Sequence, residues 1–499
     1  MAHDAPRARG ERVSTHYERG DWEAVIGLEA HVQLKTASKL FCGCSAAFGA
    51  EPNEHTCPVC LGMPGVLPVA NRRAVEFAIR AALATGSTIN RASRWARKNY
   101  FYPDLPKAYQ ISQYDEPFCA GGRIDVEMED GSTRVVRLTR IHMEEDAGKS
   151  VHDATRSSKV DLNRAGVPLL EVVSEPDLRS ATEAATYLRK LRSIVRYIEV
   201  SDGNMNEGSL RCDANVSLRK RGTERFGTRT ETKNVNSFRA LERAIAYEIE
   251  RQAEILNNGG AIVQETRLWD QDRGITRSMR SKEEAHDYRY FPDPDLLALE
   301  VDEAWIERVC TELPELPDAR RRRFETEYEV PAYDAAVLTA SKELSEYYEA
   351  AVRAHHNPKA ISNWVMSDII RIANERAVES EPDFASVPVS ASDLAALVAL
   401  VDDGTISGKI AKSVFQKMTA TGEPPRTIVE REGLLQVTDE HAIAAVVERV
   451  IAANADKVAE YRAGKDKLFG FFVGQVMKES GGKANPQAVN VLLRDRLER

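Results

Sequence analysis

Acidic and histidine side chains alternate with apolar ones along two stretches of this sequence. In VIGLEAHVQL, Glu29 and His31 lie on one face of a predicted strand, about 7 Å apart, because successive side chains of a strand point to opposite faces. In EGSLRCDANVSLR the same alternation puts Ser209, Arg211 and Asp213 on one face. The pattern therefore predicts two strands, each with one apolar and one polar face.

A third stretch, TRTETKN, places Arg229, Glu231 and Lys233 on a common face. A histidine with several carboxylates is typical of a site where oxygen ligands and an imidazole hold Mg²⁺ against a phosphate. A solvated face of an antiparallel sheet produces the same alternation. Both interpretations stay open on the pattern alone.

The stretch HMEEDAGKS ends like a phosphate-binding loop but lacks the chemistry of one. Met143 stands where the first glycine of that motif belongs, and Glu144, Glu145 and Asp146 would repel phosphates. The same carboxylates can bind the magnesium ion that accompanies phosphates. A solvated acidic turn is the alternative.

The segment RKNYFYPDLPKAYQISQYD sets Lys98 and Lys107 among five aromatic residues and two prolines. A rigid segment with lysine donors among flat side chains is suited to line a cleft for an anionic substrate. The alternative interpretation is an aromatic-rich surface loop that packs on the core.

Four of the seven cysteines, Cys42, Cys44, Cys57 and Cys60, lie within nineteen residues. Two close pairs on a loop can form a tetrahedral set of four sulfurs, which suits zinc, and such a closed site holds structure without performing chemistry. A redox dithiol and simple burial as apolar side chains are the alternatives. Reduced thiols are expected, because the number of cysteines is odd and the N-terminal segment has no apolar signal.

Length and composition indicate several domains with an ordinary core. The 499 residues exceed the roughly 250–300 at which one hydrophobic core stops growing. Hydrophobic residues make up 42%, and the longest apolar run is far shorter than the roughly 18 residues of a membrane span. We therefore predict a cytoplasmic protein with no membrane segment and a disordered tail over residues 1–20.

The periodicity of apolar residues changes along the chain. Strand-like alternation predicts an α+β domain on an antiparallel sheet over residues 21–294, with the cysteines in an insertion at 40–65. Helical spacing then predicts all-α domains, a linker domain at 295–400 and a tail domain at 401–499.

The end of the chain is basic although the whole protein has a net charge of −9. From Lys457 to Arg499, nine lysines or arginines stand against five acidic residues. The lysines best suited to contact nucleic-acid phosphates are Lys465, Lys467, Lys478 and Lys483. A solvated helix face is the alternative.

Taken together, these stretches resemble one family, the B subunits of glutamine-dependent aspartyl/glutamyl-tRNA amidotransferases. The resemblance runs from about Glu23 to the C-terminus and includes VIGLEAHVQLKTASKLFCGCSAAFGAEPN, NRAGVPLLEVVSEPD, ETRLWD and EEAHDYRYFPDPDL. It implies a core similar to the glutamine synthetase fold. It also implies that ATP phosphorylates the side-chain carboxylate of glutamate or aspartate on mischarged tRNA, after which ammonia displaces phosphate.

The resemblance implies roles for single residues as well. The residues expected to bind magnesium are Glu29, His31, Glu145, Asp213 and Glu231. Those expected at the cleft where activated substrate meets ammonia are Lys98, Tyr100 and Lys107. Those expected to contact phosphate or substrate are Ser209, Arg211 and Lys233.

The sequence contains no amidase signature, so the resemblance implies that glutamine is hydrolysed by a partner. The expected protein partners are an A subunit, which is the amidase, and a small C subunit, so that the three chains form a heterotrimer. The mischarged tRNA is expected to bind the C-terminal helical domain. Two rival interpretations are a ligase that acts on a free amino acid and a non-catalytic tRNA-binding scaffold with a structural zinc knuckle.

Overall fold

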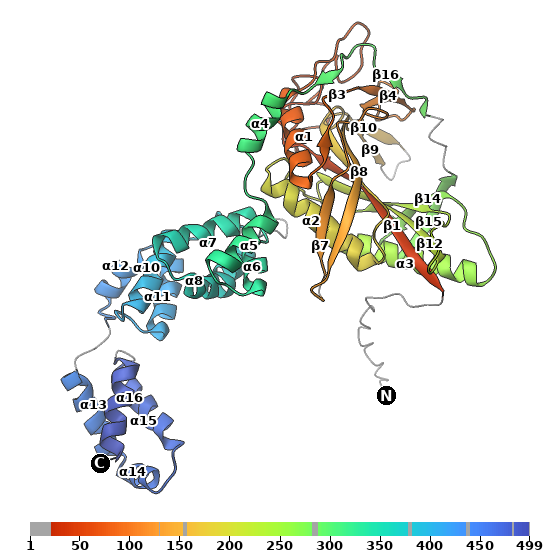
Figure 1. Cartoon of the computed structure of the whole chain (residues 1–499). Coiled ribbons are helices and arrows are strands. Elements are labelled where there is room, and N and C mark those ends of the chain that lie inside the picture. Colours follow the sequence, from red (N-terminus) through yellow and green to blue (C-terminus); the bar gives the residue numbers. More distant parts are fainter. Residues whose placement is uncertain are drawn as a thin grey trace. The chain divides into compact units, whose positions relative to one another are not determined.

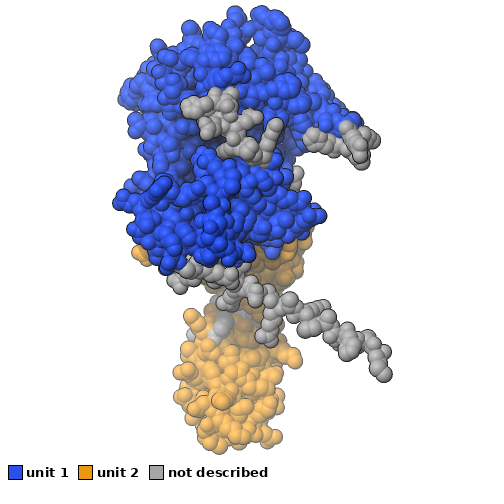
Figure 2. All heavy atoms as spheres, turned by 90° about the vertical axis from the view of Figure 1, so that its right-hand side faces the viewer, with its two compact units in different colours: residues 1–316 blue, residues 317–499 orange. Residues whose placement is uncertain are grey.

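The computed structural model describes residues 21–128, 130–152, 157–281, 288–377, 382–435, 440–481 and 484–498. The chain divides into two compact units, residues 1–316 and 317–499 (Figure 2). The tail predicted over residues 1–20 lies outside the described residues. None of the helices in the described ranges combines the length and the apolar character that a membrane crossing requires.

A ten-stranded sheet dominates the first unit (Figure 1). Its strand order is β15-β14-β13-β12-β1-β11-β8-β6-β2, and β7 pairs with β8. The strands are β1 (Trp22–Gln33), β2 (Thr88–Ile89), β6 (Cys119–Ala120), β7 (Arg123–Glu127), β8 (Thr133–Glu145), β11 (Pro168–Ser174), β12 (Leu210–Lys220), β13 (Thr230–Val235), β14 (Glu265–Asp270) and β15 (Ile275–Ser281).

The sheet is mixed, whereas the sequence predicted an antiparallel one. All pairs within it are antiparallel except β13 with β14, which run parallel. The chain between these two strands forms the helix α3 (Phe238–Asn257). A helical crossover of this kind is the connection that parallel neighbours require.

Short strands and three more helices complete the described part of the first unit. The short strands form three small sheets, β9 (Lys149–His152) with β10 (Ser158–Asp161), β3 (Ala92–Ser93) with β17 (Leu299–Glu300), and β4 (Ala96–Asn99) between β5 (Tyr109–Ser112) and β16 (Phe291–Pro292). The helices are α1 (Arg72–Thr85), α2 (Ala181–Tyr197) and α4 (Glu303–Thr311).

The core lies on one face of the large sheet, as the alternation in β1 and β12 predicted. Ile26, Leu28 and Val32 are at most 1% exposed and belong to the same hydrophobic cluster as residues of α2 and α3. These two helices lie side by side along that face (Figure 1). Burial of each such aliphatic side chain contributes about 1.5–3 kcal/mol. The alternate residues of β1 are thereby confined to the other, polar face.

The second unit is helical, as predicted. Its first core is formed by α5 (Pro317–Glu327), α6 (Ala332–Leu338), α7 (Lys342–Ala354), α8 (Pro358–Trp364), a π-helical turn (Val365–Ile369), α9 (Ile370–Glu375), α10 (Ala391–Asp402), α11 (Gly408–Thr421) and α12 (Pro425–Arg431). Its second core is formed by α13 (Glu440–Ala453), α14 (Ala455–Arg462), α15 (Leu468–Glu479) and α16 (Pro486–Glu498).

These divisions differ from the predicted boundaries at 294/295 and 400/401. Residues of α4 join the core of the first unit, so this helix belongs with the sheet. Residues of α11 and α12 share the core of α5–α10. Helical periodicity identifies the helices but does not reveal which core each one joins.

Candidate active site

The polar face of the sheet collects charged side chains from five neighbouring strands, β13, β12, β1, β11 and β8. The register sets Glu29 opposite Asp213 and His31 opposite Glu171. It also sets Glu171 opposite His142. Because directly paired residues share a face, the strands predicted to carry the site are joined by β11, which sequence reasoning had not included, and by β8, which ends in the predicted Glu144 and Glu145.

His31, Glu144 and Glu171 form the tightest group on this face. His31 Nε2 lies 3.6 Å from a Glu144 carboxylate oxygen and 3.7 Å from a Glu171 carboxylate oxygen. One ligand atom from each of the three residues lies within 4.8 Å of the other two. His142 Nε2 lies 3.2 Å from Glu171 Oε2. Two carboxylates and an imidazole form a donor set that suits a hard divalent cation.

Glu145 is not part of this group, although the resemblance had placed it there. As the next residue of the strand after Glu144, it faces the opposite side. Its carboxylate accepts hydrogen bonds from the Lys107 ammonium and from the backbone N–H of Ile111, the latter at 2.9 Å. The side chains of Lys107 and Glu145 are 7% and 3% exposed, so they form a buried ion pair.

Asp213 and Glu231, the other predicted ligands, enclose Lys233. The Lys233 ammonium donates to Asp213 Oδ2 and lies 3.3 Å from Glu231 Oε1. Thr266 Oγ1 donates to the second oxygen of Glu231 at 2.8 Å. Both carboxylates are therefore held in place by hydrogen bonds from neighbouring strands.

The electrostatics of this face favour a cation. Burial and the negative charges of Glu171, Glu231 and Asp213 raise the pKa of Glu29, and only a hydrogen bond from Asn215 Nδ2 at 2.8 Å acts against them. Burial also acts to raise the pKa of Glu171, but the neighbouring His142 and His31 lower it below its usual range. A divalent cation bound near Glu29 would relieve this repulsion.

Lys98 and Tyr100 lie close to the histidine and carboxylate group. The Lys98 ammonium is 5.0 Å from the ring centroid of Tyr288 and 5.9 Å from that of Tyr100. Burial acts to lower the pKa of Lys98, but Glu144 is the largest of several neighbours that raise it above its usual range. The ammonium is thus kept charged inside an aromatic enclosure.

Ser209 immediately precedes β12, and Arg211 is the second residue of this strand. Arg211 Nη2 lies 2.7 Å from Asp146 Oδ2, while its buried Nε has no hydrogen-bond partner within the described structure. Ser209 is buried, and its carbonyl accepts the N–H of Gln33 at 2.8 Å. Of these two, Arg211 has donor capacity left for a ligand.

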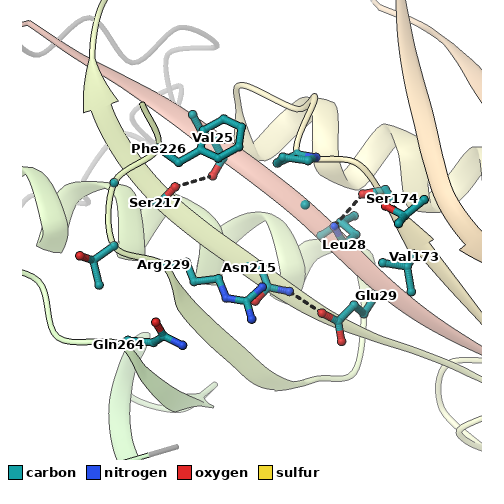
Figure 3. A pocket seen from close by; sticks show the side chains of 15 residues that line it. Val25, Leu28, Glu29, Val173, Ser174, Asn215, Ser217, Phe226, Arg229 and Gln264 are labelled. Atoms are coloured by element: carbon teal, nitrogen blue, oxygen red, sulfur yellow. Dashed lines mark hydrogen bonds between the residues drawn. The ribbon is translucent and has the colours of Figure 1, made fainter. Parts of the chain in front are cut away.

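A cavity of about 560 Å³ adjoins Glu29 on the same face. Phe226, Arg229 and Gln264 contribute side chains to it from outside the central strands, and Figure 3 shows Arg229 reaching towards Asn215 and Glu29. The remaining lining residues are Val25, Gly27, Leu28, Thr139, Val173, Ser174, Pro176, Ser217, Gly227 and Thr228. An apolar wall beside a few polar groups is typical of small-molecule and cofactor sites.

The four clustered cysteines come together away from this cavity. One sulfur from each of Cys42, Cys44, Cys57 and Cys60 lies within 4.8 Å of the others. The Cys57 and Cys60 sulfurs are 3.9 Å apart, close to the edge of about 3.8 Å that a tetrahedron with Zn–S bonds of about 2.3 Å requires. A hydrogen bond from Cys42, together with the Cys57 N–H and the Lys39 ammonium, lowers the pKa of Cys60 to about 4. The donor set therefore fits zinc.

Three of the four predicted nucleic-acid lysines lie at or near the ends of α15. Lys467 precedes its first residue and Lys478 is in its last turn, and both belong to the basic end of the chain. Lys465 is exposed and pairs with Glu460 at 3.0 Å. Lys483 lies outside the described residues.

Sequence reasoning did not single out Glu171 or His142. A signal for Glu171 was present in PLLEVVS, where one acid interrupts an apolar strand. Burial of a carboxylate is costly unless a partner compensates it. Such an isolated acid is therefore a better indicator of a site than an acid in an exposed turn.

The fold and the site define a sheet-based catalytic unit followed by a helical unit, and comparisons with known proteins give the same division. The family model described as "GatB/GatE catalytic domain" matches residues 24–307. A second model, described as "GatB domain", matches residues 346–497.

Curated relatives then specify the family. A protein of Geotalea daltonii is 59% identical over 482 residues, which cover 96% of this chain and 100% of the relative. Proteins of Thioalkalivibrio sulfidiphilus and Moorella thermoacetica are each 57% identical over 480 residues, covering 96% of this chain and 100% of each relative. All three are named as the B subunit of an aspartyl/glutamyl-tRNA(Asn/Gln) amidotransferase. The chain belongs to this family.

Proposed function

We propose that this chain is the member of a tRNA-dependent amidotransferase complex that activates the side-chain carboxylate of glutamate or aspartate on a mischarged tRNA with ATP. The activated carboxylate then receives ammonia, which gives the amide. The observation that carries this proposal is the convergence of His31, Glu144 and Glu171 beside a half-buried, charged Lys98. The names of the relatives agree with this chemistry.

In this proposal His31, Glu144 and Glu171 hold a magnesium ion, with Glu29 beside them. A bound magnesium ion neutralises charge on the phosphates and thereby assists phosphoryl transfer. His142 orients Glu171, since its Nε2 is 3.2 Å from that carboxylate. Asp213 and Glu231 complete the acidic face and hold Lys233 ready for a phosphate oxygen.

The cavity beside Glu29 is suited to the nucleotide. Phe226 contributes an apolar ring, and Arg229 a cation, to the lining of this cavity (Figure 3). A cavity of about 560 Å³ falls within the roughly 300–1,000 Å³ of typical ligand sites. Arg211 and Ser209 are proposed to contact the transferred phosphate or the substrate.

Lys98 and Tyr100, two of the three residues predicted there, are proposed to line the cleft where the activated carboxylate meets ammonia. Lys98 stabilises the negative charge of the acyl phosphate, because the enclosing rings keep water from its ammonium. Lys107 acts on the other side of β8 by holding Glu145.

Ammonia is proposed to come from the amidase, or A, subunit, with a small C subunit to complete the heterotrimer. The helices beyond residue 400, with Lys465, Lys467, Lys478 and Lys483, are proposed to bind the tRNA. The four-cysteine cluster is proposed to hold a structural zinc ion. The likeness of the core to glutamine synthetase and a cytoplasmic location remain predictions.

The test is an amidation assay with the partner proteins, ATP, glutamine and each mischarged tRNA. Asp213→Ala and Glu144→Ala are expected to abolish ATP-dependent amidation while mischarged tRNA still binds, because the acidic face is distant in sequence from the tail lysines. Glu224→Ala, which changes an exposed acid of the same unit, serves as the control. Full activity in the first two variants would favour the non-catalytic scaffold instead.

A second arm tests the tRNA role of the tail. Truncation after residue 435 removes α13–α16 together with the core that these helices share, and leaves the core of α5–α12 complete. We expect weaker tRNA binding with an unchanged affinity for Mn²⁺ at the acidic face. Unchanged affinity for tRNA would show that α13–α16 do not bind the tRNA.

A further inference from the structure

Lys39 is a fully buried lysine next to the cysteine cluster. Its exposed fraction is 0%, yet its ammonium forms no ion pair with a carboxylate among the described residues. It donates to the carbonyls of His55 at 2.6 Å and Leu162 at 3.3 Å. Its remaining contact is Cys60 Sγ at 3.6 Å. A buried charge is costly unless an opposite charge compensates it, and carbonyl dipoles alone supply no opposite charge.

A tetrathiolate metal centre would supply that charge. Four thiolates around one Zn²⁺ carry a net charge of about −2. We propose that Lys39 is the outer-sphere cation of this centre, where it donates to the Cys60 thiolate and offsets half of the excess negative charge. This inference rests on the zinc centre proposed above and assigns it a residue outside the four ligands.

The position of Lys39 also joins the cysteine loop to the segment that leads into β11. Its bond to Leu162 is accompanied by one from His55 N–H to Asn163 Oδ1 at 2.8 Å, and by one from Leu162 N–H to Asn53 Oδ1 at 2.8 Å. The Leu40 N–H donates to Gly166 O at 2.8 Å. Lys39 therefore lies where the metal-binding loop and the 160–166 segment meet, shortly before the strand of Glu171 begins.

Charge and hydrogen bonding are separable by substitution. Lys39→Met fills a similar volume without charge or donors, whereas Lys39→Gln removes the charge but keeps N–H donors on a side chain that is one bond shorter. Lys39→Arg keeps the charge. Lys35→Met, four residues away at an exposed position, is the matched control.

The experiment measures zinc affinity of the full-length chain by competition with a chromophoric chelator, and the unfolding temperature with zinc and after its removal. We expect Lys39→Met and Lys39→Gln to bind zinc about 10–100-fold more weakly than the wild type, the range seen for partners of metal ligands. Lys39→Arg is expected to lie closer to the wild type, and Lys35→Met to equal it.

The rise in unfolding temperature on zinc binding separates this role from a purely structural one. Stabilisation by a ligand depends on its affinity, so the rise should be smaller in Lys39→Gln than in the wild type. Loss of the carbonyl bonds alone would lower the unfolding temperature equally with and without zinc. If Lys39→Met does not fold, Lys39→Gln carries the same comparison.

Two results would overturn the inference in distinguishable ways. Equal zinc affinity in the wild type and both uncharged variants would show that Lys39 is not part of the centre, while the zinc proposal stands. If the wild-type chain binds no zinc, the proposed zinc centre is wrong, and so is the role inferred for Lys39.

Discussion

Replacement of Lys107 by methionine removes the cation of a buried ion pair and leaves the rest of the site unchanged. The Lys107 and Glu145 side chains are 7% and 3% exposed, and Glu145 also accepts the Ile111 N–H at 2.9 Å. Methionine is of similar length, so the main change is electrostatic. The variant retains a buried carboxylate whose countercharge is gone.

Two estimates give the expected loss in the free energy of unfolding. Breaking a buried ion pair by removing one partner costs about 3–5 kcal/mol. A carboxyl group can instead take up a proton, which at pH 7 costs about 3.7 kcal/mol, from 1.36 kcal/mol for each pH unit above the ordinary glutamate value of about 4.3. The free energy of unfolding should therefore fall by about 3–4 kcal/mol at pH 7 and about 2.3 kcal/mol at pH 6. The loss grows with pH because the folded variant then binds more protons than the unfolded chain.

Urea unfolding of the full chain at pH 6 and pH 7 measures this loss. Lys107→Met is compared with Glu145→Gln, with the double variant and with Lys35→Met, which changes an exposed lysine. The double variant should recover most of the stability, because neither charge remains and neighbouring substitutions are not additive. A loss below about 1 kcal/mol, which is the range of surface pairs, would refute the reasoning. So would a double variant less stable than Lys107→Met.

Three further outcomes are expected. Glu171→Gln should weaken Mn²⁺ binding about 100-fold or more, whereas the exposed control Glu224→Gln should not. The electron paramagnetic resonance of free Mn²⁺ measures both affinities. Equal affinities would exclude Glu171 as a ligand. Thr266→Val removes the hydrogen-bond donor to Glu231 and should slow ATP-dependent phosphate release about tenfold. The control Thr133→Val should leave the rate unchanged. An unchanged rate in Thr266→Val would show that the orientation of Glu231 does not matter for the reaction. Because burial and nearby carboxylates raise the pKa of Glu29 above its ordinary value, its charge destabilises the metal-free fold at higher pH. Glu29→Gln should therefore raise the thermal midpoint at pH 8 but not near pH 4, and a lower midpoint at pH 8 would contradict this.

The polar face of β1 and β12 was predictable because, in an alternating strand, the apolar residues show which of the two faces packs on the core. In β1 a slip of one residue would bury Glu29 and expose Leu28, so the apolar residues fix which side chains face the site. The same reasoning placed Asp213 on that face. What alternation could not supply is the order of the strands, and therefore the neighbours that each side chain meets.

Glu171 was not predicted because its strand is buried on both faces. Five of the seven residues in PLLEVVS are apolar, so the stretch has no alternation to interpret. Its role becomes visible only when β11 is placed between β1 and β8. There the carboxylate faces His31 and His142.

The sequence predicted Glu145 beside His31, but the structure places Glu144 there. The physical cause of this difference is not the one that concealed Glu171. Two adjacent acids at the end of a strand face opposite sides, and the sequence does not state which side is which. The structure shows which side is which, because Met143 belongs to the hydrophobic core cluster and Glu144 therefore points to the polar face. Glu145 then returns to the side of Met143, where a buried carboxylate needs a cation, and Lys107 supplies it from a segment 38 residues earlier. The adjacent acids thus lie on opposite sides of β8, where Glu144 is beside His31 as a proposed metal ligand and Glu145 pairs with Lys107.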